Sequence, residues 1–359
     1  METVKANYES FLVHNVSTIS TLESSLRSVT WFLPGRFKDA ELASEALTAL
    51  LNVTSMYHDT LLARIVKANP SYRPLIPSSL HSRFTRAWSD KNDVYKWAGR
   101  ALEIIRFTEL VLEMALRRKV SQKTKWRSII LLEFIKATLR VLLLRITQRP
   151  VISPPIPERD FDPSQLPSPD HDAFDPSRDE EPETPEHLQN NRVPVQLSPI
   201  LSPHSTISAE DFLLPKALTS ADVKPSLSLV RKLAGPRDWL AETVHILRPL
   251  IYASLLYADR NSKERSKRAL TVVILMEFLS RFLRRTPTTS GTLERAEYAR
   301  RDKDMLWYML RGSIWEEFTR PRIHAFAEST SRAPLLGLVG SLVKDWLPLI
   351  DDYYYYTAP

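Results

Sequence analysis

The longest apolar run in the chain, Ser128 to Gln148, constrains the fold more than any other stretch. A helix of about 20 residues is long enough for the hydrocarbon core of a bilayer, which is roughly 30 Å thick. Glu133, Lys136, Arg140 and Arg145 nevertheless interrupt the run. At about 100° per residue the first three share one narrow stripe, and Ile, Leu, Phe and Val occupy the rest of the circumference. We therefore expect a helix at or in a membrane, with its polar stripe facing protein.

Composition restricts the chemistry. The 359 residues include only 7 Gly, against 26 Pro, and no Cys. Few glycines leave little material for phosphate-binding loops, and the lack of cysteine excludes disulfides, thiolate nucleophiles and cysteine-based zinc sites. The formal charge of +7 and the isoelectric point of about 9.4 favour an anionic partner, either nucleic acid or the anionic face of a membrane.

Apolar residues at helical spacing occur on both sides of a proline-rich, acidic segment. It predicts helices over the opening residues up to Pro34-Gly35, from about Asp39 to Ile65, and from about Val94 to Arg118. Prolines then recur from Pro150 to about Pro215, together with many acidic residues, which is typical of a disordered linker. We expect a helical region over 1–149, a disordered, acidic, proline-rich insert over 150–225, and a second helical region over 226–359 that packs with the first.

The second helical region resembles the first in design. An apolar run begins near Asp238 and breaks at Pro249, and a basic stretch then precedes Ala269 to Arg285. The pattern Glu-Phe-aliphatic-x-x-x-Leu-Arg begins at Glu133 and again at Glu277, which an internal repeat or chance would equally explain. Further helices are expected around Leu306 to Phe318 and Leu335 to Leu347. The fold class is thus an all-α, membrane-associated bundle of long helical hairpins with a disordered insert.

Two groups of charged residues are the candidate sites. Carboxylates inside apolar helices can be functional groups, but they more often pair with a base one turn away. The proposed intrahelical polar stripes comprise Glu133, Lys136 and Arg140 in one helix and Glu277 and Arg284 in the other.

Short basic connectors precede both apolar helices. They can be solvated loop charge, a nucleic-acid contact or an attraction to anionic headgroups, and the flanking apolar helices favour headgroups. The membrane-surface and targeting candidates are Arg117, Arg118, Lys119, Lys123, Lys125, Arg127, Lys263, Arg265, Lys267 and Arg268.

The catalytic inventory is poor. There is no HExxH pair, no glycine-rich loop after a strand and no G-x-S-x-G elbow, and the neighbours His58 and Asp59 suit a helix surface better than an active site. We expect no enzyme, no cofactor, no small-molecule substrate and no nucleic-acid partner. No secretory or C-terminal sorting signal is visible either, so internal sequence is expected to direct the chain to its membrane.

Several stretches together resemble the peroxin-sixteen family of peroxisomal membrane proteins, in particular its fungal branch. Phe11 to Asp59 resembles the N-terminal region of that family, and ILRPLIYASLLYADR, Ile246 to Arg260, resembles the segment after its variable insert. The stretch KWRSIILLEFIKATLR resembles the central region, and the chain from Thr319 onward resembles the family's ending. The family-motif residues are Pro34, Gly35, Arg36, Phe37, Asp39, Arg248, Pro249 and Leu250.

The resemblance implies a non-enzymatic peroxisome biogenesis factor at the peroxisomal membrane, reached directly or through the endoplasmic reticulum. Such a protein acts in membrane assembly by recruiting the docking factor peroxin three and other peroxins, and it influences peroxisome division. Animal members carry a dense basic targeting cluster after the second helix, where this chain has only Arg64, Lys67 and Arg73. The alternative from another class is a soluble helical adaptor without membrane insertion.

Overall fold

Helices form the regular structure of this computed structural model, and no strand occurs among the residues it describes. The described residues are 8, 11–12, 15–32, 40–68, 79–158, 226–259, 267–285, 291–310, 314–331, 340–345 and 347. The elements with the bounds given are α2 (Val16–Phe32), α3 (Ala40–Ala68), α4 (Leu80–Lys91), α5 (Asp93–Lys119), α6 (Gln122–Thr147), η5 (Ser226–Ser228), α9 (Pro236–Ala258), α10 (Lys267–Leu283), α11 (Thr292–Asp304), η7 (Met305–Leu310), the short π-helix η8 (Trp315–Thr319) and α13 (Arg320–Ser331). The predicted all-α class is therefore confirmed for this part of the chain.

Side-chain caps define where the central helices begin. The amide oxygen of Asn92 accepts hydrogen bonds from the backbone of Val94 and Tyr95 at 2.8 and 3.1 Å and so starts α5. Ser121 accepts one from Thr124 at 3.4 Å and starts α6. Only Val120 and Ser121 separate the two helices, so most of the predicted basic connector from Arg117 to Arg127 is helical rather than loop.

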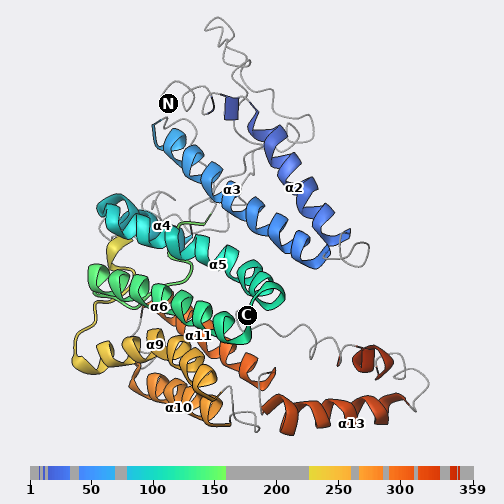
Figure 1. Cartoon of the computed structure of the whole chain (residues 1–359). Helices are drawn as coiled ribbons and strands as arrows, with labels where there is room; N and C mark the ends of the chain where they lie inside the picture. Colours follow the sequence, from blue (N-terminus) through green and yellow to red (C-terminus); the bar gives the residue numbers. More distant parts are fainter. Residues whose placement is uncertain are drawn as a thin grey trace, which may run out of the picture. The chain divides into compact units, whose positions relative to one another are not determined.

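Neighbouring helices pack in the order α5, α6, α9 and α10 (Figure 1), and α3 and α4 both pack on α5. One buried cluster joins α4, α5 and α6 through Phe84, Tyr95 and Leu143. A second joins α6, α9 and α10 through Ile129, Tyr252 and Val273. The two halves of the sequence therefore share one interior at the contact between α6 and α9.

One local prediction was wrong, and one helix was missed. The apolar run does not break at Pro249, because α9 continues through that residue to Ala258. Proline removes one backbone hydrogen bond, and flanking packing on α6 and α10 holds the helix together across it. Helix α4 was not predicted, since LHSRFTRAWSDK is polar and follows prolines at positions 70, 74 and 77.

The beginning of the predicted insert and the segment that follows the insert pack against the helices. Residues 150–158 and 226–235 are described, and Ile152 and Val230 are buried in the cluster with Phe84 and Tyr95. Residues 159–225, which make up most of the insert, lie outside the described residues. The division into regions 1–149, 150–225 and 226–359 stays a prediction.

Candidate functional site

The polar stripe of α6 pairs with α5. Glu133 is 3% exposed, and its carboxylate lies 2.8 Å from the ammonium of Lys136 one turn away. The same ammonium lies 2.7 Å from Glu109 of α5. Burial raises the pKa of Glu109, against the opposing effect of Lys136. Burial also lowers the pKa of Arg140, in spite of the nearby carboxylates of Glu133 and Glu109.

The corresponding stripe of α10 pairs with α9 and α11. Glu277 is 2% exposed and binds the guanidinium groups of Arg248 and Arg284, the latter at 3.2 Å. Arg284 also donates to Asp302 of α11 at 2.9 Å. Both copies of the Glu-Phe-aliphatic pattern therefore turn their glutamate inward, toward arginine or lysine partners.

A third ionic cluster, between α9 and α11, was not predicted. Arg301 is buried, and its guanidinium lies 2.9 Å from Glu242 and 2.9 Å from Glu297. Burial opposes the charge of Arg301, but the two carboxylates outweigh it and raise its pKa. Burial alone would raise the pKa of Glu297. The positive charges of Arg301 and Arg300 outweigh burial, so the pKa of Glu297 is lowered. The sequence TLERAEYARRDKD looks like a solvated surface helix, and only the spacing of Glu297 and Arg301 hints at a pair.

The strap, which we define as residues 148–158, is tied to this cluster. Arg301 donates to the carbonyl of Val151 at 2.6 Å, and the backbone N–H groups of Val151 and Ser153 donate to Glu242 and Glu297 at 3.4 and 3.5 Å. The buried ions therefore bind the backbone of the strap as well as one another.

The beginning of the strap is also joined to the chain that re-enters after the insert. Arg149 donates to the carbonyl of Val230, and the N–H of Leu233 donates to the carbonyl of Gln148 at 2.8 Å. We call this junction the stem. At Gly99, a Cβ would lie 3.2 Å from the carbonyl oxygen of Pro155, so α5 approaches the strap closely.

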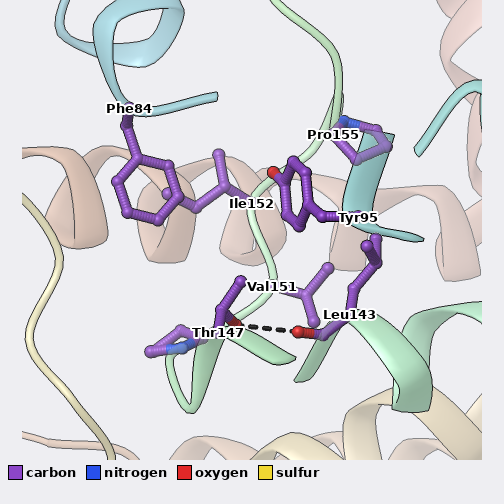
Figure 2. Close-up of a pocket in the computed structure, with 8 residues that line it drawn as sticks. Phe84, Tyr95, Leu143, Thr147, Val151, Ile152 and Pro155 are labelled. Atoms are coloured by element: carbon purple, nitrogen blue, oxygen red, sulfur yellow. Dashed lines mark hydrogen bonds between the residues drawn. The ribbon is translucent and has the colours of Figure 1, made fainter. Parts of the chain in front are cut away.

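A hollow under the strap is too small for a metabolite. It is lined by Phe84, Tyr95, Leu143 and Ile152, among others, and holds about 10 Å³ of free space, about enough for one water molecule. Figure 2 shows the hydroxyl of Thr147 bonded to the carbonyl of Leu143 and the side chains of Tyr95 and Ile152 near one another. In the part of the chain that the structure describes, no three His, Asp or Glu residues are grouped as metal ligands.

The targeting candidates are placed differently from one another. Arg117, Lys119, Lys123, Arg127 and Arg268 are exposed. Lys125 is instead turned inward, 3.3 Å from the buried Glu113. Arg118 lies 4.0 Å from Glu41 of α3, and Lys267 lies 2.7 Å from Glu317. Lys263 and Arg265 lie outside the described residues.

Three of the family-motif residues lie in α9, and the other five lie outside the described residues. Pro34, Gly35, Arg36, Phe37 and Asp39 lie outside the described residues. Arg248 is the partner of Glu277, Pro249 is inside α9, and Leu250 packs near Ile246 and Ala137.

Among the described residues, the fold and its charged interior define a helical protein whose buried ions join neighbouring helices. The chain matches the family described as "Peroxisomal membrane protein (Pex16)" over residues 6–352. The chain belongs to this family, and its location is the peroxisomal membrane.

Two relatives have names that agree with this family. The "Peroxisomal membrane protein PEX16" of Schizosaccharomyces pombe is 22% identical over 333 residues, covering 89% of this chain and 88% of that protein. The "Peroxisome biogenesis protein 16" of Arabidopsis thaliana is 29% identical over 138 residues, covering 38% of this chain and 33% of that protein. No solved structure gives a significant match.

Each of the described helices is too short or too polar to traverse a bilayer.

Proposed function

We propose that this chain acts in assembly of the peroxisomal membrane as a non-enzymatic recruiting factor. The observation that carries the proposal is the family match over residues 6–352, in a family of peroxisomal membrane proteins. A helical interior closed by paired ions, with a hollow of about 10 Å³, is consistent with a protein that binds other proteins on its surface.

Recruitment would work through two kinds of contact. The chain holds to the peroxisomal membrane, and a surface of it binds other peroxins, including the docking factor peroxin three, so that membrane-protein import machinery gathers there. The same recruitment would influence peroxisome division. The partner-binding surface is a proposal that follows from the family resemblance.

Deletion of the gene with imaging of the organelle tests this function. Absence of peroxisomes would indicate a role in membrane assembly, and a change in their number or size would indicate control of division. Normal peroxisomes in the deletion strain would overturn the proposal. Carbonate extraction separates a chain held in the membrane from an adaptor that washes off.

The exposed basic residues are proposed to contribute to targeting. Each Lys or Arg near an anionic surface contributes about 1 kcal/mol of attraction. Lys123, Arg127 and Arg268 are exposed, so joint neutralisation to glutamine should reduce peroxisomal localisation of a tagged chain. Lys125 is omitted because it pairs with Glu113 and its loss would disturb the interior. The control variant neutralises Arg27 of α2 and Arg295 of α11, which are also exposed. Unchanged localisation of the triple variant would remove the targeting role.

A further inference from the structure

Two helices carry rows of exposed apolar side chains. On α6 the row is Leu131, Phe134, Ile135 and Leu142, and Leu131 is 60% exposed. On α10 the row is Leu275, Phe278, Leu279 and Phe282, and Phe282 is 75% exposed. Within each row the residues are spaced by one, three, four or seven positions, which places them along one side of a helix. We call these rows the α6 stripe and the α10 stripe.

Both stripes lie opposite the buried ions. At about 100° per residue, Leu131 and Leu142 are on the side of α6 away from Glu133 and Arg140. The same spacing puts Leu275 and Leu279 away from Glu277 and Arg284, and the partner of Arg284, Asp302, belongs to α11. Helix α11 therefore lies on the inner side of α10, and the α10 stripe faces away from it.

Helix α9 lies between α6 and α10, packed on both (Figure 1). Its Glu242 binds Arg301 of α11, so α9 also turns its charge toward that helix. Leu240, which is 50% exposed, lies about half a turn away from Glu242 on α9. Arg140 of α6 lies near Arg300 and Arg301 of α11. Charged groups of all three helices are therefore directed toward α11, and the stripes lie on the other side of α6 and α10.

The charge on the exposed side of these helices has one sign. The only carboxylates of α6 and α10, Glu133 and Glu277, are buried, so no exposed residue of either helix is acidic. Exposed Arg127 and Arg145 lie on the stripe side of α6, one beyond each end of its apolar row. Exposed Arg268 lies before the first residue of the α10 stripe. Apolar rows with arginines at three of their four ends, and with no carboxylate among them, suit an anionic lipid surface.

We propose that the α6 and α10 stripes together form the membrane-contact face of this protein, with their apolar side chains turned toward one leaflet. The inference rests on the proposed function, which needs the chain to be held at the peroxisomal membrane. Helices that lie in the interface bury their apolar side by about 5–10 Å, while arginine side chains extend to the headgroups. The occupant is the bilayer rather than a second copy of the chain, because the family is one of membrane proteins and the stripe ends are cationic.

The absence of cysteine from the sequence allows a direct test, because a single introduced cysteine can be labelled uniquely. Full-length Phe278→Cys and Phe134→Cys, each labelled with an environment-sensitive fluorophore, are mixed with phosphatidylcholine vesicles with and without phosphatidylinositol. Leu50→Cys on α3, which is 62% exposed, and Leu306→Cys, which is 69% exposed, are the matched controls. Labels at 278 and 134 should shift to the blue and become protected from an aqueous quencher, whereas labels at 50 and 306 should not.

Flotation of unlabelled protein supplies the binding constant. Phe278→Ser and Phe282→Ser should each weaken vesicle binding about tenfold, since burial of one such side chain is worth roughly one to two factors of ten. Leu50→Ser with Leu306→Ser should leave binding unchanged. Circular dichroism of each variant shows whether it is folded, and the labelled single-cysteine proteins report on the face even where a serine variant fails to fold.

Different outcomes would overturn the membrane-contact face and the proposed recruiting function. Vesicle-bound protein whose labels at 278 and 134 remain quenchable would overturn the membrane face but leave the proposed function intact. Wild-type protein that does not bind either kind of vesicle would also overturn the membrane face. Failure of the function itself would be seen in the deletion strain, as normal peroxisomes, whatever the vesicles show.

Discussion

Loss of Arg301 should destabilise this protein more than loss of any exposed arginine. The Arg301→Met change removes ion pairs to Glu242 and Glu297 and the hydrogen bond to the carbonyl of Val151. Both carboxylates are buried, at 1% and 5% exposed, so neither can recover its interactions from water. Removal of one partner of a buried ion pair lowers the free energy of unfolding by about 3–5 kcal/mol. This is a large share of the roughly 5–15 kcal/mol that stabilises a typical domain.

Urea denaturation followed by circular dichroism measures this change in the free energy of unfolding. Arg300→Ala is the matched control, because Arg300 is the adjacent arginine, also pairs with Glu297, and is 46% exposed. A partly exposed pair of this kind is worth up to about 1 kcal/mol. If the carboxylates left behind cause the loss, then Glu242→Leu and Glu297→Leu added to Arg301→Met should restore much of it. An Arg301→Met variant as stable as Arg300→Ala would refute the reasoning.

Three further predictions concern the same interior. Gly291→Ala should destabilise by about 1–3 kcal/mol, because its Cβ would lie 2.6 Å from the carbonyl oxygen of Leu229, whereas Gly235→Ala, with nothing within 4 Å, should be nearly neutral; equal thermal melts would contradict this. His245 has its pKa lowered by burial and by Arg301 and Arg248, so its folded form binds a proton less readily than its unfolded form, and stability should fall as the pH drops below about 6.5; His245→Gln should flatten that dependence, and an unchanged slope would count against it. The pKa of Glu297 is lowered, so its contribution is present above its unfolded value of 4.5 and should be lost on further acidification; Glu297→Gln should remove this acid limb from a pH series of urea midpoints, and its persistence at full size would exclude Glu297 as the source.

The long helices were predictable because their patterns are periodic and their ends are capped. The expected helix from Val94 to Arg118 is α5, Asp93–Lys119, and the apolar run from Ser128 to Gln148 lies mostly in α6, Gln122–Thr147. The pairing of Glu133 with Lys136 also follows from a three-residue spacing on one helix. Each of these features depends only on residues that are close together in the sequence.

Other features depend on contacts between distant residues. Composition assigns Pro150 to Glu158 to the insert, but Ile152 is 5% exposed because Phe84 and Tyr95 provide a surface for it. The role of Arg301 depends on Glu242, 59 residues earlier, and a charged helix such as α11 has no pattern that separates buried ions from solvated ones. Proline inside α9 breaks a local rule, and packing on both sides compensates for it.

The stem has a consequence for how this chain can vary and be engineered. Because Gln148 binds Leu233 and Arg149 binds Val230, the two ends of the intervening segment are already fastened together by the folded part. The entropy of closing a loop grows only with the logarithm of its length, so halving or doubling the segment changes stability by about 0.6 kcal/mol. The length of the segment beyond the strap can therefore change at little thermodynamic cost, whereas the strap itself is held by the buried ions. The same position offers an internal site for a fluorescent reporter that leaves both termini of the protein untouched.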